Sequence, residues 1–178
     1  PYNSLSLHIL NELMISIVMS ASRRQEQLDV TLRSIHESSI KDYELIIVDD
    51  ASPVPLKCDE ANVMRVEPKD KWYSNPCIPY NRGLKEARGD VIVIQNPECY
   101  HVGDVLGYVR DKIRDGLYLS FSCYAINRNE TIGLKQGIMP EIKMRGFKHP
   151  EDNGWYNHPK FRPVGFHFCS AITKRDLD

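Results

Sequence analysis

Polar side chains follow three apolar stretches of this chain, and their chemistry points to a ligand site. Residues 20–24 end the first stretch, Asp49 and Asp50 the second, and Asn96 and Glu98 the third. In open α/β sheets, ligands bind beyond the carboxyl ends of the strands. A single acidic residue after a strand is more commonly a turn former or a helix cap than a ligand-binding group. Three such groups at one sheet edge, however, favour a binding site.

The apolar stretches alternate with helical patterns. Leu28, Leu32 and Ile35 recur at helical spacing, whereas residues 43–52 contain a continuous apolar run, as in a strand buried on both faces. Strands are predicted at 14–22, 43–52, 62–68, 90–98 and 117–126, and helices at 23–39, 78–90 and 102–116. The second helix is expected to end near Gly89 as its C-cap. The alternation predicts an α/β fold with a mostly parallel, Rossmann-like sheet flanked by helices.

The pattern changes after Asn127. Residues 133–165 are rich in Gly, Pro, His, Trp and Tyr and show little periodicity, which is typical of a functional loop. Residues 166–177 have the pattern of a strand that runs into a helix, and the sequence stops there. We therefore expect a single domain over residues 1–178, with a long loop and a fold that is incomplete at its C-terminus.

Composition excludes several classes of protein. The 178 residues carry a net charge of -1, with 23 basic and 24 acidic side chains, which is not the charge pattern of a nucleic-acid binder. The longest apolar run, residues 14–19, is too short to span a membrane. Five cysteines without a Cys-x-x-Cys pair predict free thiols and a reducing compartment. We expect a cytoplasmic protein, with peripheral attachment to a membrane left open.

Three stretches of the sequence together resemble the family 2 glycosyltransferases of the GT-A fold. Residues 15–35 are similar to the family's first strand, loop and helix, and residues 43–52 to its strand that ends in Val-Asp-Asp-Gly-Ser. Residues 79–106 follow its Asn-x-Gly, Ala-x-Gly-Asp and Asp-x-Asp order. The resemblance covers about residues 14–107, with a looser likeness at 164–178. It implies a nucleotide-sugar-binding part over 14–125, and an acceptor-side loop and the start of a C-terminal part over 126–178.

The resemblance also implies which residues bind the donor. Asp49 and Asp50 match the pair that reaches the base and ribose, where a carboxylate can accept charge-assisted hydrogen bonds. Arg23, Arg24 or Arg82 could neutralise phosphate, because a guanidinium matches phosphate oxygens, although each is also an ordinary surface charge. The implied donor contacts are Ser20, Ala21, Arg23, Asp49, Asp50, Asn81, Gly83, Asn96 and Glu98. Asn81 and Gly83 are expected at a helix start beneath the nucleotide.

The chain departs from the family at the Asp-x-Asp motif. Asn96 stands at the first acidic position and Glu98 at the last. The family's cofactor is a divalent metal, Mn or Mg, which links a carboxylate to the diphosphate oxygens. Glu98 supplies one carboxylate, and Asn96 supplies a neutral carbonyl oxygen or a donor to ribose. One negative charge fewer predicts weaker metal binding, and a plain turn is the alternative for this segment.

Catalytic and acceptor-side residues are less well indicated. The family's general base lies in a segment beyond the part that residues 168–177 resemble, so the catalytic base is unknown. Glu151 and Asp152 form an acidic pair that is a weak match, because it comes too early in the pattern. Trp155 and Tyr156 could stack on an acceptor sugar, with ordinary packing as the alternative.

Other aromatic and imidazole groups have no settled role in the sequence. Trp72 could also stack on a sugar, and again ordinary packing is the alternative. A downstream histidine completes the metal site in some GT-A enzymes. The candidates here are His101, His149, His158 and His167, although a lone histidine is more commonly packed or exposed than bound to a metal.

The resemblance implies transfer of a sugar, with inversion, from a nucleotide-diphosphate sugar such as a UDP-sugar to a hydroxyl of a carbohydrate, lipid-linked or protein acceptor. A sugar nucleotidyltransferase would want a glycine-rich loop after the first strand, and residues 20–25 have no glycine. A nicotinamide-dinucleotide-binding domain would need Gly-x-Gly-x-x-Gly there. A catalytically impaired binding or interaction domain stays open, because Asn96 is neutral and no base is assigned.

Overall fold

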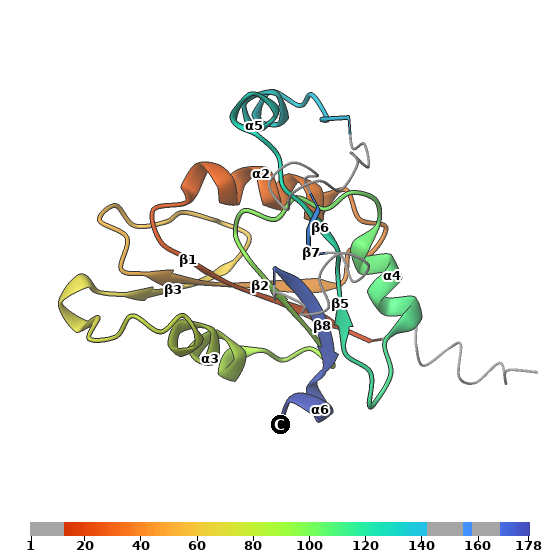
Figure 1. Ribbon diagram of the computed structural model, residues 1–178. Coiled ribbons are helices and arrows are strands. Elements are labelled where there is room, and N and C mark those ends of the chain that lie inside the picture. The colour runs from red at the N-terminus through yellow and green to blue at the C-terminus, as the bar shows by residue number, and fades with distance from the viewer. Residues whose placement is uncertain (1–12, 142–154, 158–167) are drawn as a thin grey trace, which may run out of the picture. The chain divides into compact units, whose positions relative to one another are not determined.

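The structure, a computed structural model, describes residues 13–141, 155–157 and 168–178 (Figure 1). Its elements are β1 (Ile15–Ala21), α2 (Gln25–His36), β2 (Tyr43–Asp50), β3 (Asn62–Val66), η1 (Pro68–Asp70), α3 (Cys77–Glu86), β4 (Val91–Gln95), α4 (Val105–Lys112), β5 (Leu119–Ser120), β6 (Cys123–Tyr124), α5 (Arg128–Lys135), β7 (Trp155–Asn157), β8 (Cys169–Thr173) and α6 (Lys174–Leu177). The chain divides into two compact units, residues 1–119 with 169–178, and residues 120–168.

A six-stranded sheet in the order β3-β2-β1-β4-β8-β5 forms the centre of the fold. β3, β2, β1 and β4 pair in parallel, and β8 pairs antiparallel with β4. The first five residues of β1 are 0% exposed, which is why all of them but Ser16 are apolar. The predicted α/β fold with a mostly parallel sheet is therefore confirmed.

Helices α2 and α3 lie on opposite faces of this sheet (Figure 1). The chain passes from β1 to β2 in one direction across the sheet and from β3 to β4 in the other. Because crossover connections between parallel strands are right-handed, opposite directions place the two helices on opposite faces. The direction reverses between β1 and β4, which makes the gap between these strands the topological switch point of the sheet.

Two glycines allow close packing and lie at other places in the helix pattern than predicted. Gly83 lies inside α3, not at its start, and a Cβ there would approach Val18 Cγ1 to 2.8 Å. Gly89 is not a helix C-cap, because α3 ends at Glu86 and is capped by Ala87. A Cβ on Gly89 would meet the backbone nitrogen of Ser16 at 2.6 Å. Both positions therefore need glycine because other groups approach so closely.

The region after residue 116 differs from its prediction. In place of one strand over 117–126, there are two short strands, β5 and β6. In place of an irregular loop after Asn127, there is the helix α5. A capping box starts it: Asn127 Oδ1 accepts from the Glu130 backbone N–H, and Glu130 Oε2 accepts from the Asn127 N–H. Gly137, at φ 84°, ends it.

Two further expectations can be compared with the described residues. Cys58, Cys77, Cys99, Cys123 and Cys169 all lie in the described residues, and none of them forms a disulfide bond there. In the described part of the chain, no helix has the length and apolar character needed to cross a membrane.

Candidate functional site

The predicted donor-binding groups gather at the carboxyl ends of three neighbouring parallel strands. Ala21 at the end of β1 lies beside Asp49 at the end of β2, and Met19 of β1 lies beside Gln95, the last residue of β4. This edge includes the topological switch point between β1 and β4, where ligands bind in open α/β sheets. The fold thus brings the three polar strand ends to one edge.

Asp49 is buried and organises the loop that follows β2. Its carboxylate accepts from the backbone N–H groups of Ser52 at 3.0 Å and Leu56 at 3.1 Å, and from Arg65 Nη1 at 2.6 Å. Burial tends to raise the pKa of Asp49, but these hydrogen bonds outweigh it and hold the pKa below its usual value. The side chain is 0% exposed, so Asp49 acts here through loop 51–56.

Asp50 lies at the same strand end and is more accessible. Its carboxylate accepts from Lys71 Nζ at 2.6 Å and from the Tyr73 hydroxyl at 2.9 Å. Burial and the bond to Asp50 raise the pKa of Tyr73 to about 12, while the charge of Arg82 opposes the shift. Arg65 also pairs with Glu67, its Nε lying 2.9 Å from Glu67 Oε1. Three carboxylates and three cations therefore gather at this strand end, and Arg82 is the exposed cation among them.

The loops around this strand end have unusual backbone geometry. Arg23, at φ 59°, and Ala51, at φ 61°, are the described non-glycine residues with positive φ. The Arg23 backbone N–H donates to Ser52 Oγ at 3.0 Å, which joins the loop after β1 to the loop after β2. The side chains of Arg23 and Arg24 are exposed. The hydrogen bond between Arg23 and Ser52 therefore holds Arg23 and Arg24, which are predicted to bind phosphate, beside the end of β2.

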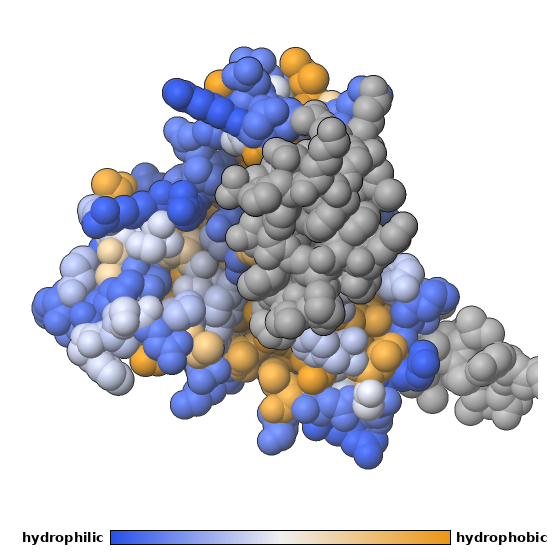
Figure 2. All heavy atoms as spheres, in the orientation of Figure 1, coloured by the Kyte–Doolittle hydropathy of each residue, from blue (hydrophilic) through white to orange (hydrophobic). Residues whose placement is uncertain are grey.

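The outer surface of the β3 and α3 side is mainly hydrophilic (Figure 2). Trp72 is an exception, because 83% of it is exposed. It lies between Lys71 and Tyr73, which both bind Asp50, and its ring contacts the Tyr73 ring edge-on at 5.6 Å between centroids. Asn81 and Arg82 are also exposed, in the middle of α3.

A turn at Asn96–Cys99 follows β4 and is held by buried side chains beneath it. The Cys99 N–H donates to the Asn96 carbonyl at 3.2 Å. Thr31 Oγ1, from α2, donates to the carbonyl of Pro97 at 2.8 Å, and Gln95 Nε2 donates to the carbonyl of Cys99 at 3.0 Å. These bonds fix the backbone of the turn and leave the Glu98 side chain exposed.

His101 belongs to this buried support. Its Nε2 lies 2.7 Å from Gln95 Oε1, and only 5% of the residue is exposed. Burial lowers the pKa of His101 to about 4, so the imidazole is neutral at pH 7 and donates from Nε2. In this arrangement His101 stabilises the turn from within rather than facing a ligand. His149, His158 and His167 lie outside the described residues.

Oxygen atoms of the turn suit a hard divalent cation. Glu98 offers an exposed carboxylate, and Asn96 offers a half-buried amide. Mn and Mg bind such oxygens and commonly complete their coordination with water and substrate phosphates. Among the residues that the structure describes, no group of three or more His, Cys, Asp or Glu side chains could hold a metal ion. The turn therefore fits a cation shared with a bound diphosphate rather than one held by protein groups alone.

Several site residues were missed or remain predictions. Tyr80, whose hydroxyl reaches the β4 end, was missed. Its position one turn before the buried Gly83 and the partly buried Leu84 could have placed it on the helix face that packs on the sheet. The acidic pair at 151–152 lies outside the described residues. Trp155 and Tyr156 belong to β7, which pairs with β6 in the second unit, and their acceptor role stays a prediction.

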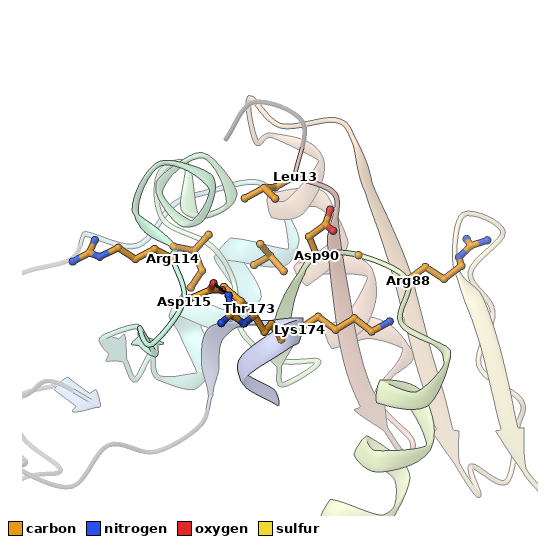
Figure 3. A pocket seen from close by; sticks show the side chains of 11 residues that line it. Leu13, Arg88, Asp90, Arg114, Asp115, Thr173 and Lys174 are labelled. Carbon is orange, nitrogen blue, oxygen red and sulfur yellow. Dashed lines mark hydrogen bonds and ion pairs between the residues drawn. The ribbon is translucent and has the colours of Figure 1, made fainter. Parts of the chain in front are cut away.

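A cavity of about 530 Å³ lies at the opposite edge of the sheet, at the amino ends of β1 and β4 (Figure 3). Basic side chains line it, but the guanidinium groups of Arg88 and Arg114 point away from it to opposite sides. Arg175 Nη1 pairs with Asp115 at 2.5 Å, and Lys174 Nζ donates to the carbonyl of Ala87. The cavity is therefore a poor anion site and lies apart from the polar strand ends.

Known proteins share both the sequence pattern and the fold. The family model Glycosyl transferase family 2 matches residues 16–175. The mannosyltransferase PcManGT from Pyrobaculum calidifontis, solved in complex with GDP-Man and Mn²⁺, has a TM-score of 0.51 and 15% identity. The match covers 92% of this chain and 45% of that one. S. aureus TarS 1-349, solved in complex with UDP, has a TM-score of 0.51 and 18% identity. The match covers 65% of this chain and 37% of that one.

These likenesses confirm the predicted GT-A fold, and at this level of identity the two structures inform the fold alone. This chain spans less than half the length of either structure. No curated protein sequence matches it.

Proposed function

We propose a donor-binding and sugar-transfer function for this chain, which belongs to glycosyl transferase family 2 because the family model matches residues 16–175. It binds a nucleotide-diphosphate sugar, with UDP as the nucleotide, at the carboxyl ends of β1, β2 and β4. It moves the sugar, with inversion, to a hydroxyl of a carbohydrate, lipid-linked or protein acceptor. The free cysteines support a cytoplasmic location, at a membrane surface where the acceptor is lipid-linked.

The observation that carries this proposal is the pairing of two unlike strand ends at one edge. The β2 end combines Asp50, which can accept from a ribose hydroxyl or a base N–H, with the nearby exposed arginines Arg23, Arg24 and Arg82. The β4 end presents the oxygen atoms of Asn96 and Glu98. A nucleoside diphosphate has hydrogen-bond donors at one end and anionic oxygens at the other, and this edge offers groups for both.

Inverting transfer needs an acceptor hydroxyl to attack the anomeric carbon as the diphosphate leaves, while a base takes the hydroxyl proton. Arg23, Arg24 and Arg82 would offset the charge that develops on the diphosphate. A divalent metal, Mn or Mg, when bound at Asn96 and Glu98, would supply further charge neutralisation there. Glu151 and Asp152 remain the candidate bases in this chain, and Trp155 and Tyr156 the candidate acceptor contacts.

Calorimetry with UDP, GDP and a UDP-sugar tests the proposal. We expect UDP to bind, and Asp50→Asn to weaken binding about tenfold or more, because a charge-assisted hydrogen bond contributes roughly 1.5–3 kcal/mol. Asp115→Asn is the matched control, because Asp115 pairs with Arg175 at the opposite edge of the sheet. Absence of binding by every nucleotide and nucleotide sugar would refute the donor-binding function.

A binding domain without turnover is the second candidate, and the neutral Asn96 is the observation that favours it. The two candidates differ in one measurement. A transferase releases UDP slowly from a UDP-sugar as water replaces the acceptor, whereas a binding domain returns the donor intact. Donor binding without any UDP release, in the presence of Mn and of candidate acceptors, would favour the binding domain.

A further inference from the structure

We infer that Tyr80 is a positioning residue that turns the Asn96 side-chain amide so that its carbonyl oxygen, and not its NH₂ group, faces the ligand beside Glu98. The inference rests on the proposed donor-binding function and concerns how the chain compensates for a neutral residue at the first position of the motif. The hydrogen bond between Asn96 and Tyr80 would leave the Asn96 amide oxygen available as a ligand for the metal.

The hydroxyl of Tyr80 lies within hydrogen-bond reach of two acceptor positions. It is 3.0 Å from the backbone carbonyl of Gln95 and 3.0 Å from the Asn96 amide atom assigned as oxygen. A phenol has one proton. With both atoms assigned as oxygens, the two contacts must share that proton in a three-centre bond, or one pair of oxygens has no proton between them.

The two contacts differ in whether that conflict can be relieved. The Gln95 carbonyl belongs to the last residue of β4 and cannot rotate. The Asn96 amide can rotate by half a turn, and the assignment of its oxygen and nitrogen depends on the hydrogen-bond network. Donation from Tyr80 to Gln95, with Asn96 Nδ2 donating back to Tyr80, gives two hydrogen bonds and no repulsion. The amide oxygen of Asn96 then points away from Tyr80.

The surroundings keep Tyr80 in this role. The turn backbone at Pro97 and Cys99 is already held by Thr31 and Gln95. The Asn96 amide is thus a movable group between the β4 end and Glu98, and Tyr80 determines which of its atoms is presented.

Tyr80→Phe tests the inference, with Tyr100→Phe as the matched control. The Tyr100 hydroxyl lies 3.5 Å from Glu37, so its loss should not affect the turn. UDP affinity is measured by calorimetry with Mn and with a chelator. We expect Tyr80→Phe to reduce the Mn-dependent gain in UDP affinity about tenfold, as for other residues that orient metal ligands, and to leave the metal-free affinity unchanged. A full Mn-dependent gain in Tyr80→Phe would overturn the inference.

Rescue separates positioning from packing. Tyr80→Phe is repeated in the Asn96→Asp background, where a carboxylate presents an oxygen in either orientation, and we expect the Mn-dependent gain of the double variant to equal that of Asn96→Asp alone. If Tyr80 acted only through packing, Tyr80→Phe would lower the gain in both backgrounds. Equal wild-type affinity for UDP with and without Mn would contradict the inference but leave the proposed function intact. Failure of wild-type protein to bind any nucleotide would contradict the proposed function itself.

A measurement on the unmodified protein does not depend on the variants folding. In ¹⁵N-labelled wild-type protein, the Asn96 side-chain NH₂ should show a nuclear Overhauser effect to the Tyr80 ring protons next to the hydroxyl. An NH₂ group distant from the ring would mean that Asn96 presents nitrogen to the ligand, and would overturn the inference.

Discussion

The ends of β2 and β4 lie at the same sheet edge but are built from different chemistry. At the β2 end, ion pairs of 2.6 Å join Asp49 to Arg65 and Asp50 to Lys71. At the β4 end, neutral groups hold the turn: Thr31 binds the carbonyl of Pro97, and His101 and Gln95 bind each other beneath it. One strand end is an ionic network and the other is a neutral network.

This difference bears on what each strand end can do. The carboxylates at the β2 end already have cationic partners, so a ligand there meets a preformed arrangement of charge. The β4 end keeps its single carboxylate, Glu98, exposed. A buried charge is costly when its partner is removed, and a buried neutral imidazole is costly when it must take up a proton. We therefore expect the β2 end to be destabilised by removal of a charged partner, and the β4 end by acid.

The largest expected effect comes from breaking the ionic network. Arg65→Ala leaves the fully buried Asp49 carboxylate without its cation, and we expect a loss of about 3–5 kcal/mol in the free energy of unfolding. Urea denaturation followed by circular dichroism measures this. Arg88→Ala is the control, because the Arg88 side chain is 78% exposed in its pair with Glu44 and such pairs contribute roughly 0–1 kcal/mol. Equal losses in the two variants would contradict the comparison.

Acid should affect the neutral network first. The pKa of His101 is about 4 in the folded protein, and its ordinary value, which applies to the unfolded chain, is 6.5, so the unfolded chain binds more protons between these values. Stability is fully present above pH 6.5 and is lost as pH falls from 6.5 to about 4, by roughly 3 kcal/mol at about 1.4 kcal/mol per pH unit. The lowered pKa of Asp49 acts at lower pH, because the stabilisation from Asp49 is lost only below the ordinary aspartate value of 3.8.

His101→Gln isolates this effect, because an amide can donate to Gln95 but does not titrate near neutral pH. We expect the unfolding free energy of the variant to change less than that of the wild type between pH 6.5 and 4. If the unfolding free energies of the two proteins changed equally with pH, His101 would not be the cause of a difference in acid sensitivity between the β4 end and the β2 end.

The sheet could be predicted because its strands are buried on both faces and read as continuous apolar runs. Residues 117–126 have a similar composition, but β5 and β6 there are only two residues each. The amino-acid composition of a segment indicates whether it is buried, but it does not indicate which neighbouring strand is available for pairing. The antiparallel direction of β8 depends on the long connection before it, which has no periodic pattern. Helix α5 was missed although Asn127, Glu130 and Gly137 are the residues that start and end it.

The candidate site was predicted in position more than in chemistry. The polar residues after β1, β2 and β4 were found because strand ends interrupt the apolar pattern. Their partners were not found, because Arg65, Lys71 and Tyr80 come from β3, from the loop after η1 and from α3. Such contacts depend on register and helix rotation. The burial of Asp49 follows from these partners, so a motif match alone could not separate it from the more accessible Asp50.

The smallest expected effect concerns backbone strain, which also differs between the two strand ends. Ala51, after β2, has φ 61°, whereas no residue of the Asn96–Cys99 turn has positive φ. The left-handed conformation costs a non-glycine residue roughly 1–2 kcal/mol. Glycine avoids this cost, but it lowers the free energy of unfolding by about 0.4–1 kcal/mol because the unfolded chain gains conformational entropy. Ala51→Gly should therefore stabilise the protein by up to about 1 kcal/mol, measured by thermal or urea unfolding.

Gly116→Ala is the reciprocal control for this strain. Gly116 has φ 76°, and an added Cβ there meets nothing within 4 Å, so only the backbone conformation is tested. We expect it to destabilise the protein by about 1 kcal/mol, the opposite sign to Ala51→Gly. If Ala51→Gly destabilised the protein instead, Ala51 would have to contribute through its methyl group. The β2 end would then depend on packing as well as on the ion pairs that set it apart from the β4 end.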